Sequence, residues 1–104
     1  MKLLDHIEVT VGDDGHIELR QPTNKEWDEF SNARFPVKRG GARMVDRSNK
    51  ARIAFFDLLV TKIDNVEDSA GPITVDTKER LPDWLKQDVI FRAFENREDV
   101  EVKN

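Results

Sequence analysis

The chain has no cysteine among its 104 residues. This absence excludes disulfide frameworks, catalysis by a thiol and zinc sites built on thiolate ligands. It does not assign a compartment, because small cytosolic proteins often lack cysteine.

Long apolar runs are also missing. The first residues, from Met1 to Leu4, are largely apolar, but Asp5, His6 and Glu8 end that run far short of a signal-peptide core. No later run approaches the length that spans a membrane. We therefore expect a soluble, cytoplasmic protein that does not enter a membrane.

Motifs for enzymatic catalysis are absent as well. No serine lies in a nucleophile elbow, and Gly40-Gly41 lacks the spacing and the following Lys-Ser/Thr of a phosphate loop. Asp28 and Glu29 are adjacent on an expected helix and point in different directions, whereas acid–base catalysis needs convergent carboxyl groups. We expect that the protein is not an enzyme and needs no cofactor.

Few residues suit a metal ion. His6 and His16 lie on the polar face of an expected hairpin but not opposite one another, which favours solvated strand histidines over a metal pair. Asp13 and Asp14 beside Gly15 resemble a calcium loop only superficially, because the later ligands of a twelve-residue calcium loop are missing. Ordinary turn chemistry accounts for them, and we expect no metal site.

What the chain does contain is a basic segment, residues 37–52, within an otherwise acidic sequence. Its charged residues are Lys38, Arg39, Arg43, Arg47, Lys50 and Arg52, against the single acid Asp46. The segment carries a net charge of +5, and since the whole chain carries −4, the remainder carries about −9. Such a division creates two electrostatic faces, one of which attracts acidic partners.

Three interpretations of this segment remain open. It could contact a phosphate backbone, dock an acidic protein partner, or simply neutralise the protein's own acidic surface. Nucleic-acid binders usually combine a basic stretch with a basic domain or with stacking aromatics. Here the sequence pI is about 5.2 and no aromatic residue lies between Val37 and Arg52, so nucleic acid is the least favoured partner.

The length fits one domain, which we expect to span residues 1–96, with a frayed charged tail at 97–104. Residues 4–20 predict a β-hairpin, because Ile7, Val9 and Val11 alternate with polar residues and Ile17 continues the apolar set. A loop formed by residues 13–15 would place Val11 opposite Ile17, with the apolar side chains of both strands on one face.

Three helices are expected after the hairpin, at about residues 24–33, 48–65 and 82–95. Thr23 and Glu26 have the spacing of a capping box, and Pro82 suits the start of the last helix. The second and third helices are apolar around most of their circumference, so the second should form the centre of the core. The expected fold class is α+β, mostly helical: an N-terminal β-hairpin followed by three α-helices.

The order of several segments resembles a known family. The segments are Leu19-Arg20-Gln21-Pro22-Thr23-Asn24-Lys25-Glu26-Trp27, then Phe35-Pro36-Val37 with a basic turn, Ala51-Arg52-Ile53-Ala54-Phe55-Phe56-Asp57-Leu58-Leu59-Val60, Asn65-Val66-Glu67-Asp68, Leu81-Pro82-Asp83-Trp84-Leu85-Lys86 and Val89-Ile90-Phe91. This layout, over about residues 18–94, is similar to the small tail assembly chaperones of long-tailed (siphovirus-type) phages and prophages.

The resemblance implies a mostly helical, non-enzymatic protein of the host cytoplasm that is absent from the finished virion. Such chaperones are thought to bind the helical tape measure protein, shield its apolar stripes and recruit tail tube subunits. The alternative is a small nucleic-acid-associated or regulatory phage protein that uses the basic segment. The N-terminal hairpin is not expected of an all-helical chaperone.

Two sets of residues are the candidates for partner binding. One small domain is not expected to cover two helices that are apolar all round, so we also expect a homo-oligomer or a bound partner. The predicted apolar contact residues are Trp84, Ile90, Phe91 and Phe94. The predicted electrostatic rim is formed by Lys38, Arg39 and Arg43.

Overall fold

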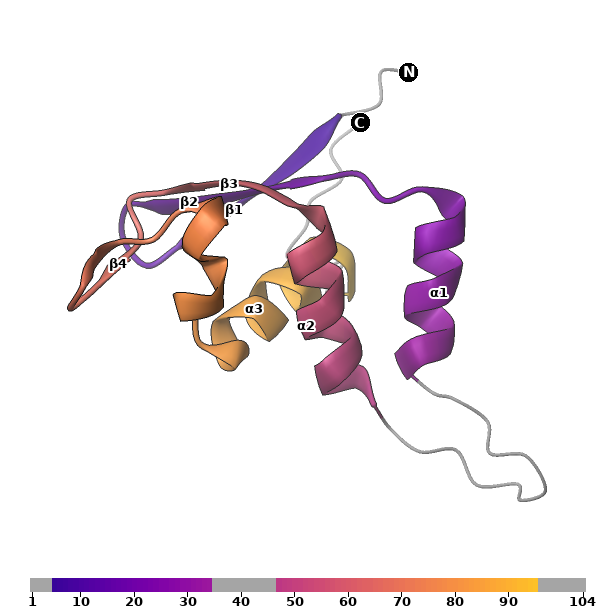
Figure 1. Cartoon of the computed structure of the whole chain (residues 1–104). Helices are drawn as coiled ribbons and strands as arrows, with labels where there is room; N and C mark the ends of the chain where they lie inside the picture. Colours follow the sequence, from indigo (N-terminus) through magenta and orange to yellow (C-terminus); the bar gives the residue numbers. More distant parts are fainter. Residues whose placement is uncertain (1–4, 35–46, 96–104) are drawn as a thin grey trace.

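The computed structural model describes residues 5–34 and 47–95 of the chain (Figure 1). Its elements, in order, are β1 (His6–Val11), β2 (Gly15–Arg20), α1 (Asn24–Arg34), α2 (Ser48–Leu59), β3 (Val60–Asp64), β4 (Glu67–Asp68), β5 (Gly71–Pro72), the 3-10 helix η1 (Val75–Arg80), α3 (Asp83–Ile90) and the π-helix η2 (Phe91–Glu95). The expected α+β class is confirmed. The expected arrangement of one hairpin and three helices is too simple.

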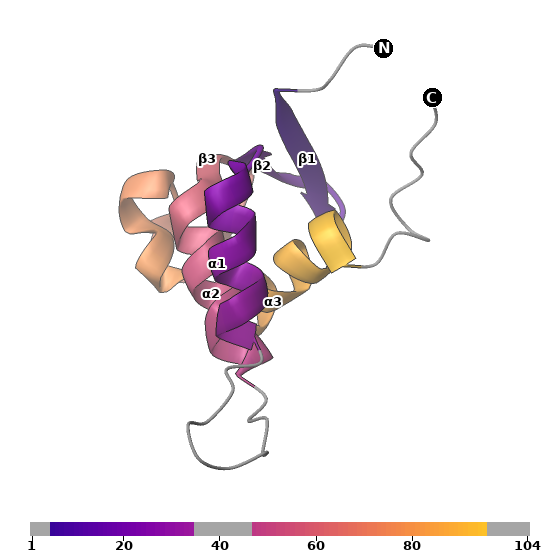
Figure 2. The ribbon, with the colours of Figure 1, turned by 90° about the vertical axis from the view of Figure 1, so that its right-hand side faces the viewer.

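The sheet has three antiparallel strands in the order β1-β2-β3. Figure 1 shows α2 and α3 beneath one face of this sheet, and Figure 2 shows α1 running alongside α2. The opposite face of the sheet has no helix over it within residues 5–34 and 47–95. β4 and β5 form a separate short pair beyond the end of β3.

The β1–β2 hairpin is present, but its register differs by two residues from the expected one. Val9 pairs with Ile17 and Val11 with Gly15, so the loop consists of residues 12–14. Gly12 takes the left-handed conformation, with φ of 62°. A Cβ atom on Gly15 would lie 2.6 Å from the Val11 carbonyl oxygen, so this paired position also needs glycine. A shift of two residues leaves the apolar side chains on one face, which is why alternation alone did not reveal it.

The second helix is shorter than the sequence predicts. α2 ends at Leu59, and residues 60–64 form β3 instead of continuing the helix to residue 65. Thr61 is an extra residue in this strand, because Glu18 pairs with Lys62 while Leu19 pairs with Val60. The bulge at Thr61 turns both Val60 and Ile63 toward the helices, although they are three positions apart.

The start of α1 agrees with the sequence. The Glu26 backbone N–H donates to the Thr23 Oγ1 at 3.1 Å, and the Thr23 N–H donates to a Glu26 carboxylate oxygen at 2.9 Å. Arg20, at the end of β2, donates two hydrogen bonds of 2.7 Å to the same carboxylate. Hydrogen bonds from Arg20 and Thr23 lower the pKa of Glu26 to about 2. The reciprocal cap therefore also fixes α1 to the end of the sheet.

The connection between β3 and α3 contains the short strands β4 and β5 and the 3-10 helix η1. Thr74 is extended, and η1 begins at Val75. Arg80 forms an ion pair with Asp68 and donates hydrogen bonds to the Gly71 and Pro72 carbonyl groups. This one side chain holds the short β4–β5 pair against η1.

The buried apolar residues form one cluster between the sheet and the helices. Its fully buried large side chains are Phe56, Ile17, Leu19, Leu59, Ile90 and Val89. At the α1 side, Phe30 and Phe55 stack with their ring centres 4.2 Å apart. Trp27 and Phe94 pack against Phe55 with ring centres 6.1 and 5.4 Å away. α2 is the central element of the core, as expected, because it contacts α1, α3 and β2.

None of the helices within residues 5–34 and 47–95 combines the length and the apolar composition needed to cross a bilayer.

Candidate functional site

An exposed apolar stripe runs along α3 and into η2. Trp84 is 67% exposed and Phe91 is 42% exposed, which are high values for such large apolar side chains. The two residues are seven positions apart, so on a helix of 3.6 residues per turn they lie within about 20° of the same line. Leu85, Val89 and Ile90 occupy the opposite, buried side of the helix. We call Trp84 and Phe91 the α3 stripe.

Charged residues border the α3 stripe. Asp88 lies between Trp84 and Phe91 along the helix and forms an ion pair of 3.1 Å with Arg92. The Arg52 guanidinium, from α2, lies 5.6 Å from the centre of the Phe91 ring. Sequence reasoning did not single out Asp88 and Arg92 for this surface, although their spacing of four residues on a helix is the usual signal of such a pair.

The other two predicted contact residues do not belong to this stripe. Ile90 has 0% exposure and lies within the core. Phe94 is partly buried and packs against Trp27 and Phe55. The wheel of the last helix is apolar nearly all round, so the sequence alone did not distinguish the side that packs against α2 from the side that remains exposed.

Another exposed apolar residue lies on the central helix. Leu58, near the end of α2, is 49% exposed. Sequence reasoning placed it among the core residues of an all-round apolar helix. Its exposure makes it a useful comparison for the α3 stripe.

The predicted electrostatic rim, Lys38, Arg39 and Arg43, lies outside the described residues. The residues on either side of positions 35–46 are described, and there the Arg47 N–H donates to the Arg34 carbonyl oxygen at 2.7 Å. This hydrogen bond brings the end of α1 next to the start of α2. Arg47 is exposed there.

The Glu95 carboxylate lies between two arginines and joins α1, α2 and η2. Glu95, at the end of η2, accepts from the Arg34 Nη1 at 2.9 Å and from the Arg52 Nε at 2.7 Å. Burial acts to raise the pKa of Glu95, but the hydrogen bonds and charges of Arg52 and Arg34 outweigh it and hold the pKa below its usual value. Within the basic segment, Arg52 therefore contributes to internal structure as well as to surface charge.

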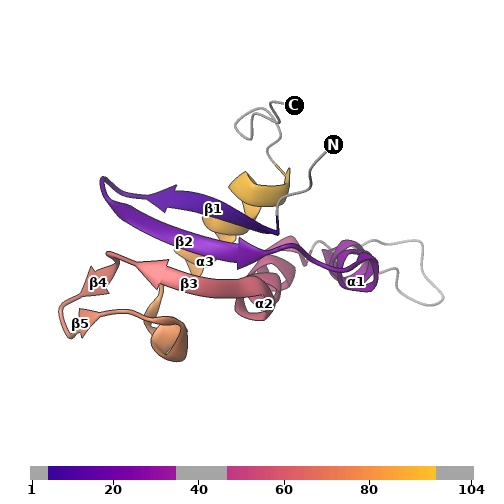
Figure 3. The same ribbon diagram turned by 90° about the horizontal axis from the view of Figure 1, so that it is seen from above.

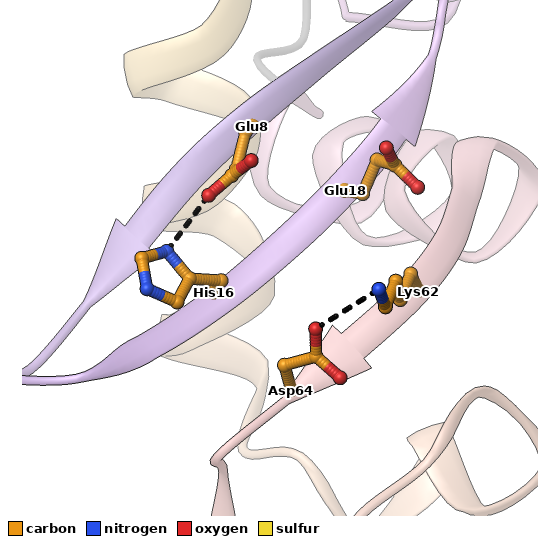
Figure 4. Close-up of a pocket in the computed structure, with 5 residues that line it drawn as sticks. All are labelled: Glu8, His16, Glu18, Lys62 and Asp64. Atoms are coloured by element: carbon orange, nitrogen blue, oxygen red, sulfur yellow. Dashed lines mark ion pairs between the residues drawn. The ribbon is translucent and has the colours of Figure 1, made fainter.

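The open face of the sheet carries a polar groove of about 100 Å³ (Figure 4). Its lining residues are Glu8, His16, Glu18, Lys62 and Asp64. Glu8 Oε1 lies 2.9 Å from the His16 Nδ1, and Asp64 Oδ2 lies 3.3 Å from the Lys62 Nζ. The side chains from β1, β2 and β3 thus lie in pairs along this face.

Each of the two histidines contacts a different carboxylate. His6 Nε2 is 3.1 Å from a Glu18 oxygen, while His16 faces Glu8. Both lie on the polar face of the hairpin, as the sequence predicted. Among residues 5–34 and 47–95, no group of three or more histidine and acidic side chains has an arrangement that could hold a metal ion.

Comparison of the chain with family models, with curated proteins and with solved structures finds no match.

Proposed function

We propose that this protein acts by binding, without catalysing a reaction, and that the α3 stripe holds an amphipathic helix of a partner protein. The observation that carries the proposal is the exposure of Trp84 and Phe91, two turns apart on one side of a helix. Helices that dock in this mode place apolar residues at matching intervals of three, four and seven. Tryptophan is also among the residues that contribute most to binding energy at interfaces.

The partner we propose is the tape measure protein of a long-tailed phage or prophage. A tape measure protein is a long helical chain with apolar stripes, which is the kind of segment that the α3 stripe would cover. In this proposal the protein is a tail assembly chaperone in the host cytoplasm that keeps the tape measure protein soluble while tail tube subunits assemble. The resemblance in segment order supports this choice of partner.

The charged residues beside the α3 stripe predict a further property of the partner helix. Asp83 and Asp88 border the Trp84 end of the stripe, and Arg92 pairs with Asp88. A partner helix with lysine or arginine beside its apolar stripe would complement these carboxylates. Such flanking charges contribute more to association rate and orientation than to affinity.

Co-expression with the tape measure protein tests the proposal. We expect a soluble complex that co-purifies with the wild-type chain, and a Trp84→Ala variant that loses most of this co-purification because a central aromatic anchor is removed. Leu58→Ala is the matched control, since it removes an exposed apolar side chain from α2 and should leave the complex intact. Equal retention by all three proteins would exclude the α3 stripe as the binding surface.

Fluorescence provides a second measurement on the same complex. The chain has two tryptophans, and Trp27 is partly buried in the aromatic cluster. In a Trp27→Phe background Trp84 is the only tryptophan of this chain, so in a complex with a partner peptide that lacks tryptophan its emission should shift to shorter wavelength when the partner helix covers it. An unchanged spectrum at saturating partner would contradict contact at Trp84.

The electrostatic rim is tested by neutralising Lys38, Arg39 and Arg43 to glutamine. If these residues steer an acidic segment of the partner, the triple variant should associate more slowly at low salt and depend less on salt. Binding of duplex or single-stranded nucleic acid that weakens steeply with salt, and that the triple variant loses, would instead favour the alternative function.

A further inference from the structure

The outer edge of β1 has unpaired backbone groups. β1 is an edge strand, because the strand order is β1-β2-β3. The Gln21 N–H donates to the Asp5 carbonyl oxygen at 3.3 Å, in register with the hairpin. Hydrogen-bonded pairs alternate along an antiparallel ladder, so Ile7, Val9 and Val11 bond to β2. The N–H and C=O groups of the alternate residues, His6, Glu8 and Thr10, therefore point away from the sheet.

The two edges of the sheet differ in protection. β3 has the bulge at Thr61, carries Lys62 and contacts η1, and each of these features hinders the addition of another strand. β1 contains no proline, no lysine and no bulge over its six residues. Within residues 5–34 and 47–95, no backbone hydrogen bond from another segment reaches the outer edge of β1.

We propose that two copies of the protein pair through β1, antiparallel and centred on Val9, to form one continuous six-stranded sheet. The sequence of β1 is nearly symmetric about Val9, with polar residues on either side of it and then Ile7 and Val11. Antiparallel pairing about Val9 places Val9 against Val9, Ile7 against Val11 and Glu8 against Thr10 of the second copy. Pairs of β-branched residues across strands are favourable.

Two other registers are poorer. A shift of one residue would set the apolar residues of one copy against the polar residues of the other. A centre on Glu8 would place two Glu8 carboxylates directly opposite each other, and like charges in that position are destabilising. In the register centred on Val9, Glu8 of each copy faces Thr10 of the other copy. The Glu8 carboxylate also lies 2.9 Å from the His16 Nδ1 of its own chain.

Incomplete burial along β1 supports a second copy as the occupant. Val9 is buried in the single chain, but Ile7 and Val11 are only partly buried, although all three face the helices. The proposed pairing places the partly buried Ile7 of one copy against the partly buried Val11 of the other. Figure 3 shows η2 below the sheet beside β1, and η2 contacts β1. A twofold axis perpendicular to the sheet keeps the helices of both copies on this same side.

Removing one outward N–H tests the pairing. Thr10→Pro deletes a donor that points away from β2, and proline is tolerated at such positions of an edge strand. By sedimentation or light scattering, we expect the wild-type chain to have twice its 12.1 kDa mass. Thr10→Pro should weaken the dimer by roughly tenfold or more, because the twofold axis removes two hydrogen bonds. Thr10→Val keeps the N–H and should remain dimeric, with both variants showing wild-type circular dichroism.

Spin labelling tests the register without relying on a disruptive variant. The chain has no cysteine, so Thr10→Cys and Lys25→Cys each provide a single labelling site. Pairing about Val9 places the two Thr10 positions diagonally across the interface, about 8 Å apart, which should cause strong dipolar broadening. Labels at Lys25 on α1 should show none. A monomeric wild-type chain, a dimer unaffected by Thr10→Pro, or narrow spectra from labelled Thr10→Cys would each overturn the proposal.

Discussion

On β2, Ile17 and Leu19 point toward the helices and are wholly buried, whereas His16 and Glu18 lie on the open face among other charged side chains. The same strand therefore contributes to two surfaces of opposite character, because successive side chains point to opposite faces of a sheet. The helix-covered face holds the core cluster. The open face holds contacts between histidines and carboxylates of β1 and β2, and an ion pair between Lys62 and Asp64 within β3.

The difference between the faces is energetic as well as chemical. Truncating a buried aliphatic side chain to alanine costs about 2–5 kcal/mol. An exposed ion pair contributes about 0–1 kcal/mol, since water and salt screen it. Stability should therefore depend on the covered face, while the open face remains free to vary in charge.

The largest effect is expected from Ile17→Ala. Ile17 is 0% exposed and pairs with residues on both neighbouring strands. Its truncation should lower the free energy of unfolding by about 2–5 kcal/mol, because it removes buried apolar contacts and leaves a cavity. Urea unfolding followed by circular dichroism measures this change. A loss below about 1 kcal/mol would mean that the covered face is less tightly packed than its burial indicates.

A smaller effect is expected from Glu95→Gln, which tests an ion pair on the helix side of the molecule. Loss of the negative charge weakens the hydrogen bonds that join Arg34, Arg52 and Glu95, and should cost about 1–2 kcal/mol by urea unfolding. Glu29→Gln is the control, since Glu29 lies 3.9 Å from Lys25 on the exposed side of α1. Equal losses of unfolding free energy in the two variants would mean that the Glu95 ion pairs, which connect three elements, stabilise the fold no more than the exposed Lys25–Glu29 pair.

The dependence of unfolding free energy on pH in the acid range tests the role of Glu26. Its pKa is lowered to about 2 in the folded state, whereas an unfolded chain has a glutamate pKa of about 4.3. The stabilisation is thus complete above the unfolded value and is lost as pH falls through about 2. Glu26→Gln retains an oxygen that can accept the cap hydrogen bond but loses the charge. Urea midpoints of the two proteins should differ at pH 6 and converge as pH falls from about 4 to 2. A constant difference would contradict this linkage.

The smallest effect is expected from Lys62→Ala on the open face. Lys62 is exposed, and its pair with Asp64 spans 3.3 Å. We expect a change within about 0.5 kcal/mol in urea unfolding. Lys62 is adjacent to the buried Ile63, so the pair Lys62→Ala and Ile63→Ala compares the two faces within one strand. Similar losses in both would contradict the contrast between the faces.

Much of the hairpin and the start of α1 follows from local sequence. The alternation of β1 identifies its apolar face, and the spacing of Thr23 and Glu26 identifies the cap of α1. The register did not follow, because Gly12 and Gly15 both stand at the turn. The structure assigns the left-handed conformation to Gly12 and the close backbone approach to Gly15.

β3 shows most clearly where local pattern is insufficient. Val60 and Ile63 are three residues apart, which is helical spacing and continues the apolar pattern of α2. The bulge at Thr61 turns both toward the core from a strand. The β-branched residues from Val60 to Ile63 were the available signal, but the strand forms because the edge of β2 provides a partner for its backbone.

The candidate site was predicted in part. Trp84 and Phe91 are exposed, whereas Ile90 is in the core and Phe94 is partly buried. The sequence shows that α3 is apolar on several sides. Only its packing against α2 decides which of those sides is left uncovered.

By itself, the sequence determined the features that depend on neighbours along the chain: the alternating hairpin, the capped start of α1, the apolar character of α2 and α3, and the absence of thiol chemistry. The tertiary structure alone decided the hairpin register, the end of α2 at Leu59 and the exposed side of α3. Each of these depends on which distant residues share a surface. A periodic pattern fixes the face of an element but not the partner that covers it.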